Sequence, residues 1–99
     1  MNMKNYRILG QLLGCYFHQD WPEEFSNSSG VIHEIINSES RDRLLAGASE
    51  LDQLIALNLS EEACREIMIA KIGCFFEPGS EGLTYADWLL RVRAAFLEQ

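Results

Sequence analysis

Apolar side chains recur at three- and four-residue steps in five separate stretches of this sequence, whereas the alternating apolar-polar patterns of strands are scarce. Such spacing places the apolar side chains on one face of an α-helix. The first four stretches end at proline, glycine or short polar connections, which separate one helix from the next. A chain of 99 residues has the length of one domain. The sequence therefore predicts an all-α fold, a compact single-domain bundle of about five helices over residues 1–99.

Start and stop signals locate these helices along the chain. The expected segments are residues 4–18, 29–37 and 40–57, then one helix that starts after Ser60 and one that starts after Thr84. Ser60 and Thr84 are residue types that cap helix N-termini with a side-chain oxygen. Gly73 is predicted to end the fourth helix in the left-handed conformation that favours glycine. Pro22 suits the first turn of a short helix between the first two.

Two segments are expected to pack in a special way. Gly10 and Gly14 lie one turn apart in the first helix, where the absence of side chains allows another helix to approach closely. The segment Cys74 to Leu83 contains two glycines and a proline, so we predict a structured loop before the last helix, pinned by Phe75 and Phe76. Helical spacing places the aromatic side chains Tyr16, Trp88 and Phe96 in the core, and core is also the preferred position for Trp21 and Phe75.

The charge balance narrows the range of partners. Fifteen Asp and Glu residues oppose eight Lys and Arg residues, which gives a net charge of −7. This argues against direct nucleic-acid binding, which requires neutralisation of phosphates, and against an anionic membrane surface. It permits a basic protein partner, although acidity also serves simply to keep a small protein soluble. No apolar run approaches the ~20 residues of a membrane helix, and the expected location is cytoplasmic.

Cysteine and histidine spacing gives no support for a metal, a cofactor or a redox centre. Cys15, Cys64 and Cys74 form no C-x-x-C pair, and buried, reduced thiols are expected. His18 and His33 are isolated, and no H-x-x-x-H spacing occurs. We therefore expect no cofactor and no metal site.

The segment Tyr16 to Pro22 carries the strongest candidates for chemistry. His18 and Asp20 are the one His-acid pair close in sequence, and Cys15 precedes His18 by three residues. A histidine oriented by a carboxylate can activate a thiol, so a small hydrolase or transferase is one hypothesis. Each residue also has a structural role: Asp20 caps the helix that Pro22 starts, His18 bonds at a helix end, and Cys15 packs. We favour the structural interpretation, with no catalytic residue.

The acidic residues are better interpreted as surfaces. Two groups lie on irregular segments, where binding residues concentrate, namely Asp20, Glu23 and Glu24 in one connection and Glu77 and Glu81 in the loop. A third group, Glu61, Glu62 and Glu66, lies on the fourth helix. Any of these groups is also compatible with a solvated face of no further function.

Three segments together resemble a known family. The box Tyr16-Phe17-His18-Gln19-Asp20-Trp21 follows a short first helix, and the segments Gly73 to Pro78 and Gly82 to Leu89 come later in the chain. With Leu51 to Leu54 in the middle helix, this arrangement resembles the small CdiI-type immunity proteins of bacterial contact-dependent growth inhibition. The resemblance covers nearly the whole chain.

The resemblance implies a helical, non-enzymatic protein that binds and neutralises the C-terminal toxin domain of a cognate CdiA-type effector. Such toxins are often nucleases, and an acidic inhibitor suits a basic nuclease cleft. The residues expected to contact the toxin are Asp20, Glu23, Glu24, Glu77 and Glu81. The residues expected to hold the fold together are Tyr16, Phe17, His18, Asp20, Trp21 and Trp88. The alternative is a helical adaptor or regulatory module that binds some other protein.

Overall fold

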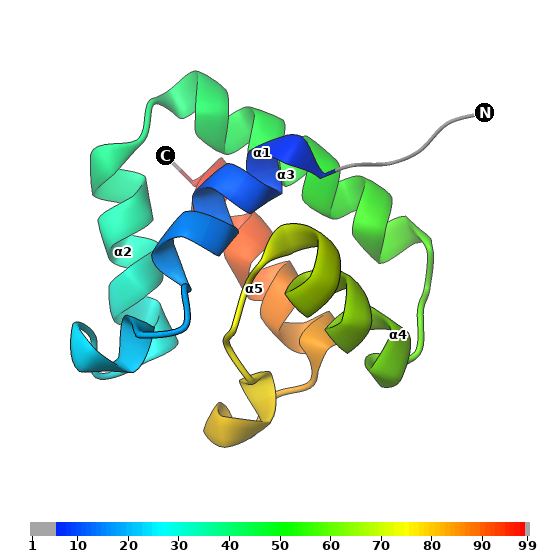
Figure 1. Ribbon diagram of the computed structural model, residues 1–99. Coiled ribbons are helices and arrows are strands. Elements are labelled where there is room, and N and C mark those ends of the chain that lie inside the picture. The colour runs from blue at the N-terminus through cyan, green and yellow to red at the C-terminus, as the bar shows by residue number, and fades with distance from the viewer. Residues whose placement is uncertain (1–5, 99) are drawn as a thin grey trace.

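Helices form all of the regular structure in residues 6–98, the part of the chain that this computed structural model describes (Figure 1). The elements in order are α1 (Arg7–Leu9), η1 (Gly10–Gly14), η2 (Trp21–Glu23), α2 (Ser28–Ser38), α3 (Arg41–Ala56), α4 (Glu61–Glu66), η3 (Ile67–Ile72), η4 (Pro78–Glu81) and α5 (Tyr85–Leu97). No strand occurs in this range. The predicted all-α fold with five α-helices is confirmed.

The predicted first helix, residues 4–18, is correct in place but wrong in length and type. Helical backbone runs from residue 7 to residue 16, and Gly10–Gly14 is π-helical. Positions 4 and 5 lie outside the described residues. A Cβ atom on Gly14 would lie 2.2 Å from the backbone oxygen of Ile72, so the expected close approach of another segment is confirmed there. That segment is η3, which is also π-helical.

The remaining helix boundaries follow the predicted signals. The side-chain oxygens of Ser60 and Thr84 accept hydrogen bonds from the third residue after each, at 3.1 Å in both cases, which is the geometry of an N-cap. Gly73 ends η3 with φ of 80°, in the left-handed region. Local sequence chemistry is sufficient to place these boundaries because each cap acts within a few residues of its own position.

Helix α5 lies in the middle of the molecule, with α3 as its main partner and α2 and α4 on other sides (Figure 1). Trp88, Val92 and Phe96 give it a buried face. The Cα radius of gyration is 12.4 Å, close to the value of about 13 Å for a compact chain of roughly 100 residues. None of the helices in residues 6–98 is both long enough and apolar enough to span a membrane.

An aromatic cluster joins the box to the loop before α5. The ring of Phe17 lies 5.5 Å from the rings of Trp21 and Phe76 and 5.3 Å from that of Trp88, between centroids. The backbone N–H of Phe75 donates to the carbonyl of Phe17 at 2.9 Å. Edge-to-face contacts, such as those of Phe17 with Trp21 and Trp88, add stability beyond the burial of apolar area. The cluster therefore holds two segments together that are about sixty positions apart in the chain.

Four burial predictions are wrong, and one of them is Trp21, which is only partly buried. Phe75 is 45% exposed, because burial alternates along residues 74–78 and its neighbours Cys74 and Phe76 occupy the buried positions. Cys15 is exposed, whereas Cys64 and Cys74 are buried as expected. Tyr16 is only partly buried, and its hydroxyl donates to Oε2 of Glu39 at 2.9 Å.

Candidate functional site

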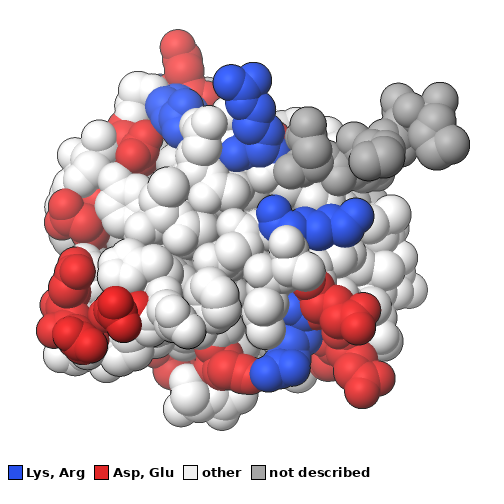
Figure 2. All heavy atoms as spheres, in the orientation of Figure 1, with Lys and Arg blue, Asp and Glu red and all other residues white. Residues whose placement is uncertain are grey.

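The two acidic segments singled out in the sequence lie side by side. The ring of Trp21 in η2 is 5.6 Å from that of Phe76, directly before η4, and Glu81 of η4 contacts Ser28 just beyond η2. Figure 2 shows acidic side chains gathered along the lower edge of this face, where Figure 1 places η2, η4 and α4. We call the five predicted contact residues, Asp20, Glu23, Glu24, Glu77 and Glu81, the acidic edge.

The η2 part of the edge presents carboxylates to solvent. Asp20 occupies the N-cap position, but its side chain forms no capping bond, so the predicted cap is wrong. The turn is held by other groups, because Nδ1 of His18 accepts from the backbone N–H of Asp20 at 3.1 Å. Nε2 of His18 lies 3.7 Å from a carboxylate oxygen of Glu24, and Glu23 has no side-chain partner among the described residues. These charges are available to a partner.

Glu81 has a different role at the other part of the edge. Its carboxylate accepts from the backbone N–H of Ser28 at 2.8 Å and from the Ser28 hydroxyl at 2.7 Å. The same hydroxyl oxygen accepts from Nε1 of Trp88 at 3.4 Å. Negative charge at a helix N-terminus is favourable, so Glu81 stabilises the start of α2. Reversing its charge would damage the fold as well as any interface.

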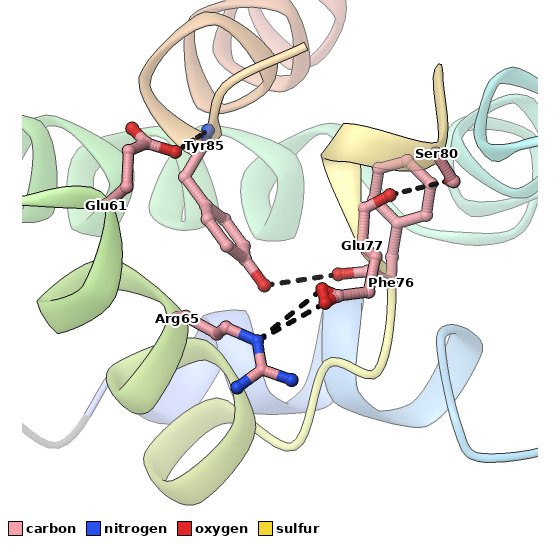
Figure 3. Close-up of polar contacts among 6 residues, drawn as sticks. All are labelled: Glu61, Arg65, Phe76, Glu77, Ser80 and Tyr85. Carbon is pink, nitrogen blue, oxygen red and sulfur yellow. Dashed lines mark hydrogen bonds and ion pairs between the residues drawn. The ribbon is translucent and has the colours of Figure 1, made fainter. Parts of the chain in front are cut away.

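Glu77 lies at the mouth of a hollow of about 300 Å³ between α4, η4 and the start of α5. Figure 3 shows its carboxylate facing Arg65, whose Nε lies 3.2 Å from Oε2. Both side chains are about half exposed, so the pair contributes little to stability and is open to exchange with outside charges. Tyr85 also lines this hollow, and its hydroxyl donates to the carbonyl of Phe76 at 3.4 Å.

Within residues 6–98, Glu81 is one of three glutamates that cap a helix from a distant position in the chain. In each case a carboxylate oxygen accepts from a backbone N–H in the first turn of another helix, where such groups lack partners within the helix. Glu50 accepts from Leu9 at 2.8 Å, Glu61 from Tyr85 at 2.6 Å, and Glu81 from Ser28 at 2.8 Å. These roles could not be predicted from local sequence because the partners are 24 to 53 positions apart. Some of the acidic residues of this protein therefore stabilise the fold.

Burial around the loop makes the fold sensitive to alkaline pH. Burial, with a further contribution from Glu77, raises the pKa of Tyr85 from 10.0 to about 12. Burial also raises the pKa of Cys74 from 9.0 to about 12. The unfolded chain therefore releases these protons at a lower pH than the folded chain, and the free energy of unfolding falls as pH rises through this range.

We expect the free energy of unfolding, measured by urea denaturation, to decline between pH 9 and pH 12. The Tyr85→Phe variant removes one of the two groups and should decline less steeply above pH 10. An identical decline in the variant and the wild type would show that Tyr85 does not contribute to the effect.

The structure offers little for the catalytic hypothesis. Cys15 is exposed, but the ring nitrogens of His18 contact the backbone of Asp20 and the carboxylate of Glu24 rather than the thiol. Within residues 6–98, no group of three His, Cys, Asp or Glu side chains is arranged to hold a metal ion. The contacts that the described residues show for the box are those of a turn and an aromatic cluster.

Comparisons with known proteins match this fold. A chain in the crystal structure of a CdiA-CT/CdiI complex from Y. kristensenii 33638 superposes with a TM-score of 0.84 at 27% sequence identity. The alignment covers 93% of the present chain and 98% of that chain. A comparison with curated proteins found no match. The family model of the CdiI immunity protein matches residues 5–96. The chain therefore belongs to the CdiI immunity protein family.

Proposed function

We propose that this protein binds the C-terminal toxin domain of a cognate CdiA effector in the cytoplasm and neutralises it by forming a stoichiometric complex, without turnover. The observation that carries this proposal is the family match over residues 5–96. The similar chain in a CdiA-CT/CdiI complex supports it, because that fold occurs together with a CdiA C-terminal domain.

We further propose that the toxin is a basic nuclease and that the acidic edge covers its substrate cleft. A nuclease cleft carries Lys and Arg side chains that bind phosphates. Carboxylates on η2 and at Glu77 would pair with these cations in place of the substrate. The net charge of −7 supports this arrangement, because complementary charge accelerates association and selects the partner.

The acidic edge divides into two kinds of residue. Asp20, Glu23 and Glu24 are exposed and contribute nothing essential to the core, so they are proposed to act directly on the toxin. Glu77 has a surface cation partner in Arg65, which a toxin cation would replace. Glu81 is proposed mainly to hold α2 and η4 in place, because both of its carboxylate oxygens accept hydrogen bonds from Ser28.

Reversing two η2 charges tests the electrostatic proposal. We expect Glu23→Lys with Glu24→Lys to slow association with the toxin domain about tenfold or more at low salt, because rim charges act mainly on the association rate. The difference should shrink at high salt, where exposed charges are screened. Stopped-flow mixing with the purified C-terminal domain of the cognate CdiA effector measures the association rates of the variant and the wild type at low and high salt.

The matched control changes the net charge equally at the other end of the molecule. Asp42→Lys with Glu98→Lys lies where α3 begins and α5 ends, away from η2 and η4 (Figure 1). We expect a much smaller effect from this pair. Equal slowing by both double variants would mean that net charge alone matters, and the acidic edge would lose its assigned role.

A further inference from the structure

A groove of about 240 Å³ runs between α2 and α5. Ile32 and Ile36, one turn apart on α2, line one wall, and Val92 of α5 lies on the other. Ile32 and Ile36 are only partly covered, although both pack against the core. A recess of this size, with isoleucine and valine side chains on its walls and polar side chains around them, accommodates a side chain rather than a cofactor, since ligand sites for small molecules usually exceed about 300 Å³.

The rim of the groove carries one arginine, Arg91, which is opposite in charge to the exposed carboxylate of Glu81. Arg91 on α5 and His33 on α2 both line the groove and are exposed. Arg91 has no carboxylate partner within 4.0 Å among residues 6–98, whereas Arg43, Arg65 and Arg93 each have one. A guanidinium with no ion pair in the described part of the chain, beside the walls formed by Ile32 and Ile36, is suited to a partner that presents an apolar side chain next to a carboxylate.

We propose that this groove receives one apolar side chain of the CdiA toxin domain, while an adjacent carboxylate of the toxin pairs with Arg91. The proposal rests on the proposed function, because it takes the toxin as the partner. The position supports a shared interface, since Glu81 lines the groove and also belongs to the acidic edge. One partner of ordinary size can therefore cover both surfaces.

The two surfaces are expected to act on different rates. Exposed carboxylates along the acidic edge steer the encounter and affect association. A side chain buried in the groove is released only when the complex separates, so the groove should govern dissociation. Anchors in pockets usually carry a large part of the binding energy, and the charges around them carry less.

Filling the groove provides the first test. Ser29 lines the groove at an exposed position in the first turn of α2, and Ser29→Trp would occupy the recess. We expect dissociation from the purified toxin domain to accelerate at least about tenfold, with association nearly unchanged. The control is Asn37→Trp, which adds the same side chain to the same helix at an exposed position outside the groove.

Reversing the rim charge provides the second test and does not depend on how Ser29→Trp folds. Arg91→Glu should accelerate dissociation several-fold, whereas Arg7→Glu, the same charge change at another exposed arginine without an ion pair in the described chain, should not. Wild-type dissociation rates for both Ser29→Trp and Arg91→Glu would overturn the groove proposal and leave the proposed function intact. Failure of the wild-type protein to bind the toxin domain would overturn both.

Discussion

Replacement of Phe76 with alanine is expected to lower the free energy of unfolding by about 3–5 kcal/mol. Phe76 is 1% exposed, and its ring contacts those of Phe17, Trp21 and Trp88 at 5.5, 5.6 and 4.8 Å between centroids. The substitution removes the ring that joins the box to the loop, and leaves a cavity between segments that cannot collapse without moving α5. Urea denaturation followed by tryptophan fluorescence measures the loss.

The adjacent residue provides a matched control. Phe75 has the same side chain but is 45% exposed, so Phe75→Ala should change the free energy of unfolding by no more than about 0.5–1 kcal/mol. Because both variants replace phenylalanine with alanine, a difference between their free energies of unfolding reports the burial of the ring. Similar losses at both positions would contradict the finding that the Phe76 ring is buried while the Phe75 ring is exposed, and would also contradict the aromatic cluster.

Replacement of Gly14 with alanine is expected to lower the free energy of unfolding by about 2–3 kcal/mol. The added Cβ would lie 2.2 Å from the backbone oxygen and 3.4 Å from the carbonyl carbon of Ile72. Backbone atoms cannot move aside as the end of a flexible side chain can, so η1 and η3 would have to separate. The loss should exceed the gain of about 1 kcal/mol that alanine normally brings to a helix.

Gly10 is the control for this effect, one turn earlier in the same segment. A Cβ at Gly10 would lie 3.7 Å from the same backbone oxygen, an ordinary contact distance. Gly10→Ala should therefore leave the free energy of unfolding unchanged or raise it slightly. Chemical denaturation of the two variants side by side measures the difference. Equal stability of both would mean that η1 and η3 are not in close contact at Gly14.

Much of the fold follows from local sequence signals. Ser60 and Thr84 cap the helices that they precede, and Gly73 ends η3, because each acts through bonds within a few residues. The π-helical backbone of η1 and η3 was not predicted. It occurs where two segments almost sixty positions apart pack backbone against backbone at Gly14, and the hydrophobic periodicity of either segment alone carries no information about that contact.

The sequence was sufficient to choose the residues of the candidate site, but it did not show what each of these residues does. The acidic segments at η2 and η4 could be chosen from charge and irregular structure, and the chain does bring them together. Glu81 and Glu61 look like surface charges in the sequence, yet both cap distant helices. Such roles depend on which helix ends the fold places nearby. The groove at Arg91 depends in the same way on the spacing of α2 and α5.

The most direct test of the account is a calorimetric titration of this protein with the C-terminal domain of the cognate CdiA effector, combined with an assay of toxin activity. We expect one molecule to bind one toxin domain, with toxin activity falling to zero at equal concentrations. Weaker binding at higher salt is expected from the contribution of the acidic edge. Absence of binding, or a complex that retains full toxin activity, would contradict the assignment of this chain as the immunity partner.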